Sequence, residues 1–130
     1  MPAPEPISVE DLHDIHDEVI SSPDGAASGV RDPGALEAAV ARPQSSFGGV
    51  EFYPTTFTKA AAIMESIIQR HPFVDGNKRT GLLAAVFLLY QEGYTLGASQ
   101  REQADLAVNV ADHVLDVDSL SEWFAEHVRR

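Results

Sequence analysis

The residues best suited to chemistry lie together in one stretch, His71-Pro72-Phe73-Val74-Asp75-Gly76-Asn77-Lys78-Arg79-Thr80-Gly81. It holds a proton acceptor, a carboxylate, a Gly-Asn turn and two cations. An unbroken apolar run, residues 82–90 (LLAAVFLLY), follows directly. Because a helix that is apolar all round is usually buried, we expect the polar stretch on a loop and on the first turn of a core helix.

The local geometry of this stretch follows from its residue types. Pro72 disfavours helical dihedral angles at His71, so the preceding helix should end near Arg70. Gly76 permits a tight turn, and Asn77 is a favoured helix-start residue that can cap its own backbone. The next helix should therefore begin near Gly76–Asn77. Its free N–H groups would point back at the loop and form an anion-binding nest.

Two cations in the first turn of this helix also indicate an anion. The helix dipole disfavours positive charge there, by about 0.3–1 kcal/mol for each of Lys78 and Arg79. A nucleotide phosphate would supply the missing negative charge. Asp-Gly-Asn is also a common turn sequence, and a histidine before proline is usually solvated. The local residues alone therefore leave both an anion site and an ordinary turn open.

The pattern His71-x-Phe73-x-Asp75-Gly76-Asn77-x-Arg79 resembles the core motif of the Fic/Doc superfamily. Lys78 after the asparagine makes the chain similar to the Doc (death-on-curing) toxins of bacterial toxin–antitoxin modules. The similarity extends to residues 30–36 (VRDPGAL), 41–43 (ARP) and 52–54 (FYP), and covers roughly residues 7–95. Such a long spaced match is more specific than a short motif alone.

The resemblance implies a role for each site residue. His71 would be the general base toward a target hydroxyl, because imidazole titrates near neutral pH. Asp75 would bind Mg²⁺, an ion often held by one or two carboxylates together with phosphate oxygens. Gly76 and Asn77 would cradle a phosphate of ATP.

Lys78 and Arg79 would stabilise charge on the transferring group, which is the main task in phosphoryl transfer. The Doc resemblance implies a kinase that phosphorylates a threonine of elongation factor Tu and so blocks translation. Fic AMP-transferases carry glycine at position 78 and a second arginine at position 82, where this chain has Lys78 and Leu82. Gly76 matches the Fic pattern, so AMP transfer to a protein hydroxyl is the alternative. A catalytically silent partner-binding module is a second one.

Many Fic enzymes inhibit themselves through a Ser/Thr-x-x-x-Glu-Gly/Asn helix. The one glutamate here that precedes glycine or asparagine is Glu92, and Leu88 stands four residues before it. The resemblance therefore implies a separate antitoxin, whose tail folds as a helix into a groove on the toxin.

Composition bounds these interpretations. A chain of 130 residues with 44% hydrophobic content suits one domain, expected at residues 7–130 after a disordered leader at residues 1–6. The formal charge of −11 argues against direct binding of nucleic acid. There is no cysteine, no signal-peptide pattern and no apolar run that could cross a membrane, so we expect a cytoplasmic protein.

Periodicity and capping signals predict an all-α, Fic/Doc-like bundle of about six helices. Helices are expected after Ser8, Asp32, Thr55 or Thr56, Gly76 and Ser99, and the last after Asp118 or Ser119, carrying Trp123, Phe124 and Val128. The interpretation of residues 44–53 is a short hairpin or flap. By resemblance its Gly48, Gly49 and Tyr53 line a target-docking groove; the alternative is an ordinary connection. His13 and His16 have a spacing that suits a metal, but two surface or boundary histidines explain it better.

Overall fold

The computed structural model describes residues 5–22 and 27–130, and its helices confirm the all-α prediction. The six α-helices are α1 (Val9–Ile20), α2 (Pro33–Ala41), α3 (Thr56–Arg70), α4 (Asn77–Gln91), α5 (Gln100–Ala111) and α6 (Val117–His127). A 3₁₀ turn, η1 (Arg42–Gln44), extends α2. Four short strands complete the described elements: β1 (Ser46–Phe47), β2 (Val50–Glu51), β3 (Thr95–Leu96) and β4 (Val128–Arg129). Residues 1–4 of the expected leader lie outside the described residues.

Side-chain caps place most helix starts where the sequence predicts them. Ser8, Thr55 and Ser99 each accept a hydrogen bond from the backbone N–H three residues on, and each is part of a reciprocal capping box. Asp32 caps α2, with Pro33 at its first position.

The prediction for the last helix was wrong at both ends. Asp116, not Asp118 or Ser119, is the N-cap of α6: its carboxylate accepts from the Ser119 N–H. Val128 lies in β4 rather than on the helix. There it pairs with Leu96 of β3, in a small antiparallel sheet that the sequence did not indicate.

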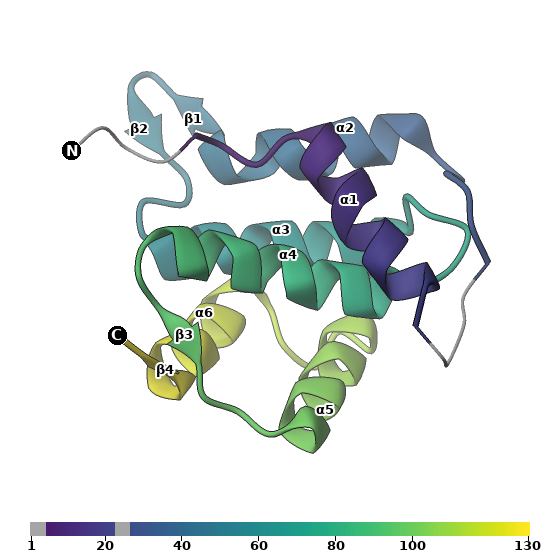
Figure 1. Cartoon of the computed structure of the whole chain (residues 1–130). Helices are drawn as coiled ribbons and strands as arrows, with labels where there is room; N and C mark the ends of the chain where they lie inside the picture. The colour runs from purple at the N-terminus through teal and green to yellow at the C-terminus, as the bar shows by residue number, and fades with distance from the viewer. Residues whose placement is uncertain (1–4, 23–26) are drawn as a thin grey trace.

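Helices α3 and α4 form an antiparallel pair at the centre of the molecule, with α1 and α2 on one side and α5 and α6 on the other (Figure 1). Gly81 is the point of close approach: a Cβ there would lie 2.8 Å from the Ile68 Cγ1 atom. The largest fully buried side chains include Phe73, Phe124, Leu12, Ile63, Met64, Ile67, Ile68 and Leu89. This core surrounds α3 and reaches into the loop between α3 and α4.

Helix α4 is only partly buried, contrary to the expectation from its apolar sequence. Leu83 and Tyr90 are exposed, at 40% and 73% of their surface. The reason is that α4 packs against α3 on one face and leaves other apolar side chains open. None of the described helices combines the length and apolarity needed to span a membrane.

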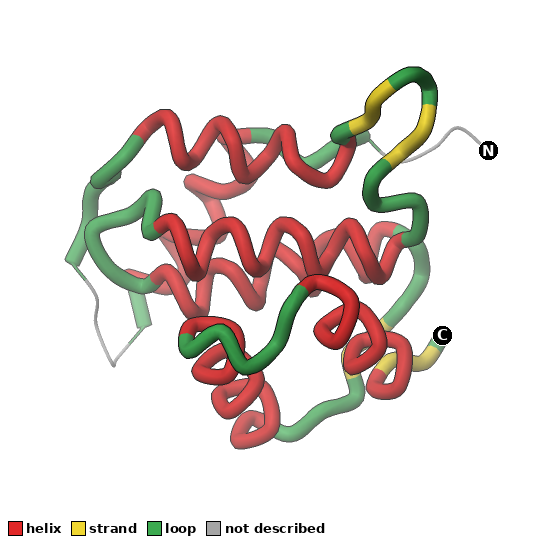
Figure 2. Tube along the Cα trace, turned by 180° about the vertical axis from the view of Figure 1, so that it is seen from behind, coloured by secondary structure: helices red, strands yellow, loops and turns green. Residues whose placement is uncertain are grey.

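The predicted hairpin exists, and β1 and β2 are its strands. It follows η1 and precedes the N-terminus of α3, whereas the loop of residues 71–76 follows the C-terminus of α3. Both views show the hairpin and that loop at opposite ends of the α3–α4 pair (Figure 1, Figure 2). The 15 residues of α3 correspond to about 22 Å of helix.

Candidate active site

His71 ends α3 in a left-handed conformation, with φ 51° and ψ 61°. Such a backbone is strained for any residue but glycine, so neighbouring contacts must hold it. Arg31 provides them: its Nε donates to the His71 carbonyl at 2.6 Å, and its Nη2 donates to the Arg70 carbonyl. These are two of the carbonyls that a helix C-terminus leaves without partners. The imidazole of His71 itself is exposed.

The segment after His71 is tied to residues 29–32. The Pro72 carbonyl accepts from the N–H groups of Arg31 and Asp32, at 2.8 and 3.0 Å. The Val74 N–H donates to the Gly29 carbonyl at 2.9 Å, and Phe73 forms an isolated bridge with Val30. The loop is thus paired with a segment some forty residues away in sequence.

Asn77 secures the loop from the other side. Its Oδ1 accepts from the Phe73 N–H at 3.0 Å, and its Nδ2 donates to the Phe73 carbonyl at 2.9 Å. Asn77 is buried, and the N-cap position of α4 belongs to Gly76, which has φ 78°. The expected cap at Asn77 is therefore one residue too late, and its amide holds the main chain of Phe73.

His16 on α1 is the third anchor. It is buried, at 4% exposure, and its ring stacks on Phe73 with centroids 3.9 Å apart and planes 7° from parallel. Its Nε2 lies 2.9 Å from the main-chain oxygen of Asp75. A carbonyl oxygen can only accept, so Nε2 is the donor. The expectation of a surface or boundary residue was wrong for His16; His13 is half-buried and meets the edge of Phe73.

The Asp75 carboxylate is exposed and accepts two backbone hydrogen bonds, from Gly76 N–H at 2.8 Å and from Ala27 N–H at 3.3 Å. These two bonds, and more weakly the nearby Arg79 guanidinium, hold the pKa of Asp75 below its ordinary value. The carboxylate is therefore ionised at neutral pH, with lone pairs remaining on both oxygens.

The N-terminus of α4 begins just beyond. No side chain of the described residues caps it, and the left-handed Gly76 followed by helical residues makes a nest of N–H groups. Lys78 and Arg79 lie in this first turn and are exposed, and Arg79 donates to the Ser22 hydroxyl at 2.9 Å. The predicted start of the helix near Gly76–Asn77, with two cations in its first turn, is thus confirmed.

These features meet at a pocket of about 370 Å³, lined by His71, Val74, Asp75, Gly76, Asn77, Lys78 and Arg79. A magnesium ion fits its donor set. The described residues contain no cluster of three or more histidine, cysteine, aspartate or glutamate side chains. Asp75 offers one exposed carboxylate with lone pairs left on both oxygens, which suits an ion that also takes phosphate oxygens and water.

A second hollow adjoins the pocket. It is a groove of about 710 Å³ between α4 and α5, and it shares Lys78 and Arg79 with the pocket. Its walls are largely apolar, with Leu82, Leu83, Ala104, Ala107 and Val108, and Arg101 lies at the α5 side. Leu82, which stands where Fic AMP-transferases have a second arginine, faces this groove.

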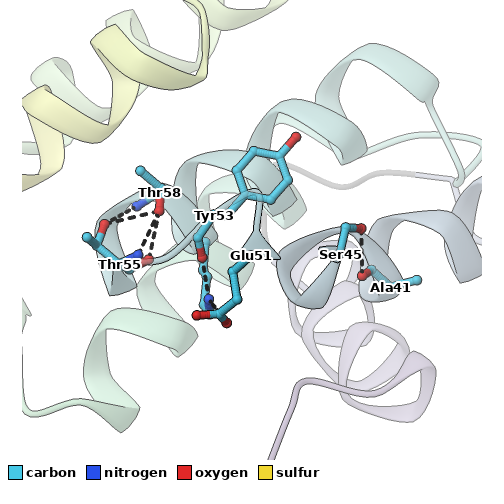
Figure 3. Close-up of polar contacts among 7 residues, drawn as sticks. Ala41, Ser45, Glu51, Tyr53, Thr55 and Thr58 are labelled. Carbon is cyan, nitrogen blue, oxygen red and sulfur yellow. Dashed lines mark hydrogen bonds and ion pairs between the residues drawn. The ribbon is translucent and has the colours of Figure 1, made fainter. Parts of the chain in front are cut away.

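The hairpin residues are not brought to the pocket: Gly48, Gly49 and Tyr53 are absent from its lining. The Tyr53 hydroxyl accepts from Arg42 Nε at 3.0 Å, which ties the hairpin to η1. Lys59 Nζ donates to Glu51 Oε1 and to the Tyr53 carbonyl. Figure 3 shows how Glu51 and Tyr53 lie beside the start of α3. Target docking at this hairpin stays a prediction, and it would occur away from His71.

Sequence reasoning missed two residues that build the site, Arg31 and His16. Arg31 lies in residues 30–36, one of the segments that resemble the Doc toxins. The residues beside it in sequence did not indicate that its guanidinium reaches the end of α3. His16 had one usable signal, because it lies four residues after Leu12 and three before Val19, on the apolar face of the helix. A buried imidazole needs a hydrogen-bond partner, which would have directed attention to a distant carbonyl.

Comparison with known proteins shows the family of this chain. The model of the Fic/DOC family matches residues 6–89. Toxin Doc of Mycolicibacterium smegmatis is 45% identical over 94 residues, which are 71% of this chain and 72% of that protein. Protein kinase doc of Escherichia phage P1 is 34% identical over 116 residues, which are 89% of this chain and 90% of the phage protein.

Proposed function

Since the chain belongs to the Fic/Doc family, we propose that it is the toxin of a toxin–antitoxin module and transfers a phosphoryl group from ATP to a protein hydroxyl. The observation that carries the proposal is the uncapped N-terminus of α4, which sits beside an exposed histidine and an ionised carboxylate in one pocket. The names of two relatives, a Doc toxin and a Doc protein kinase, support the same class.

The residues divide the work by their chemistry. The N–H groups of the first turn of α4, with Lys78 and Arg79, bind phosphate oxygens and stabilise the charge that develops during transfer. His71 accepts the proton of the attacking hydroxyl as its oxygen bonds to the γ-phosphorus and ADP leaves. Magnesium held by Asp75 would neutralise further phosphate charge. Asn77 acts indirectly, by holding the main chain of Phe73.

The acceptor implied by the Doc resemblance is a threonine of elongation factor Tu. Phosphoryl rather than AMP transfer is favoured by Lys78 and Leu82. Lys78 brings a long cation to the pocket, and Leu82 cannot hold a phosphate where AMP-transferases use arginine.

Radiolabelled ATP tests the reaction directly. The purified protein would be incubated with Mg²⁺, a bacterial lysate and ATP labelled on the α- or the γ-phosphate. We expect one labelled protein from γ-labelled ATP, no label from α-labelled ATP, and none with H71A. Transfer from α-labelled ATP would establish AMP transfer instead. If neither α- nor γ-labelled ATP labels a protein, the result would favour a partner-binding module without catalytic activity.

We also propose that a cognate antitoxin covers the groove between α4 and α5. An amphipathic helix suits its apolar walls, and acidic residues at the helix edge would meet Lys78, Arg79 and Arg101. Val108 is 45% exposed and lies in the groove away from the pocket. V108E should therefore remain toxic in cells but no longer be neutralised by the antitoxin, while V114E, outside the groove, should stay neutralised. Equal neutralisation of both variants would place the antitoxin elsewhere.

A further inference from the structure

We propose that His16 is a positioning residue for this site, which sets the plane of the Asp75–Gly76 peptide from the neighbouring helix α1. The inference rests on the proposed function for its consequence in catalysis. The geometry itself stands independently of which group is transferred. His16 itself lies outside residues 71–81, the stretch that contains the residues proposed for the chemistry.

The first support is the location of the ring. His16 is the one buried histidine among the described residues, and it lies on α1, which ends at Ile20. One face of its ring lies flat on Phe73, and its Nε2 reaches the carbonyl of Asp75 at 2.9 Å. His16 therefore contacts the loop at two residues, Phe73 through its ring face and Asp75 through its Nε2.

The second support is what that carbonyl controls. A peptide unit is planar, so holding the Asp75 oxygen also sets the direction of the Gly76 N–H on the opposite side of the same unit. That N–H donates to the Asp75 Oδ1 at 2.8 Å. One hydrogen bond from His16 therefore orients both the carboxylate expected to take magnesium and the left-handed Gly76 that opens the α4 nest.

The third support is the flexibility of the peptide without this contact. Gly76 has no side chain to restrict its dihedral angles and adopts φ 78°, one of several conformations open to glycine. Apart from His16, no described residue hydrogen-bonds the Asp75 carbonyl. Losing the imidazole would let this peptide rotate, and the carboxylate and the nest would then lose their shared orientation.

Three variants separate the effect of the hydrogen bond to Asp75 from that of the ring stack on Phe73. H16F keeps a flat ring over Phe73 but has no donor, whereas H16Q keeps a donor and loses the stack. H13F is the matched control, because His13 lies on the same helix and touches the edge of Phe73 at 6.1 Å between centroids. Thermal unfolding would first establish that each variant is folded.

The main readout needs no nucleotide: the hydrogen-exchange rate of the Gly76 amide, followed by NMR. We expect H16F to exchange about tenfold faster than the unmodified protein, H16Q to fall between them, and H13F to match the unmodified protein. Titration calorimetry with Mg²⁺ and ATP should show the same order, with an affinity about tenfold weaker in H16F. Equal Gly76 exchange in H16F and the unmodified protein, or an equal effect of H13F, would overturn the inference.

A measurement on the unmodified protein covers the case in which H16F does not fold. Long-range ¹H–¹⁵N spectra report which imidazole nitrogen carries hydrogen, and the inference requires hydrogen on Nε2 of His16. A spectrum that shows no hydrogen on Nε2 of His16 would refute the inference. Failure of the unmodified protein to transfer phosphate would count against the proposed function alone, since Gly76 exchange and the Nε2 signal would still decide the role of His16.

Discussion

Replacing Asn77 with alanine tests how the loop is held. The Asn77 amide is the partner of both the N–H and the carbonyl of Phe73, a residue with no exposed surface. After N77A neither group would have a protein partner, and neither could reach bulk water. An orphaned buried polar group costs about 1–3 kcal/mol, so we expect the free energy of unfolding to fall by at least about 2 kcal/mol.

The corresponding change in melting temperature follows from chain length. An unfolding entropy of roughly 2.1 cal/mol/K per residue gives about 0.27 kcal/mol/K for 130 residues. A loss of about 2 kcal/mol therefore lowers the midpoint by roughly 7 °C. Differential scanning calorimetry and urea titration would measure the two quantities independently.

The other asparagine of the chain provides the control. Asn109 lies on α5, and its side chain makes no hydrogen bond to any described residue. N109A should therefore change the free energy of unfolding by no more than about 0.5 kcal/mol. If N77A were as stable as N109A and lost only ATP affinity, the amide would serve the phosphate, as the family resemblance implies, and our account of Phe73 would be refuted.

Three further variants or conditions test the packing and the site. G81V should lower the free energy of unfolding by about 1–3 kcal/mol, because even a Cβ would lie 2.8 Å from Ile68; urea titration measures this, and an unchanged midpoint would contradict the close packing of α3 and α4. Folding lowers the pKa of Asp75, so its stabilising contribution is present above the unfolded pKa, near 4, and is lost as pH falls through the folded value. The urea midpoint should therefore drop more between about pH 5 and about pH 3 in the unmodified protein than in D75N, and parallel curves would argue against the two backbone hydrogen bonds. R31A should reduce the rate of label transfer about tenfold, with a smaller effect on ATP affinity, because it frees the strained backbone of His71; an unchanged rate in initial-velocity assays would show that His71 is held by other contacts.

The sequence by itself determined most of the helix starts and the break between α3 and α4. Capping residues such as Ser8, Thr55 and Ser99 act on N–H groups three residues away, so their effect can be read locally. Pro72 and Gly76 likewise act on their own or adjacent dihedral angles, which is why the sequence predicts the break between α3 and α4 close to its observed position. The positions of Lys78 and Arg79 on the first turn of α4 follow from that break.

Tertiary structure alone decided where the side chains of the site point and what holds them. His16 and Arg31 reach the loop from segments about forty to sixty residues away, and no local pattern encodes such a contact. Asn77 could cap the helix, bind phosphate or hold the loop from its sequence alone, and only the folded chain shows its amide bonded to the buried main chain of Phe73. The length of α3 separates the β1–β2 hairpin from His71. These features depend on how the helices pack, and packing is a property of the whole chain.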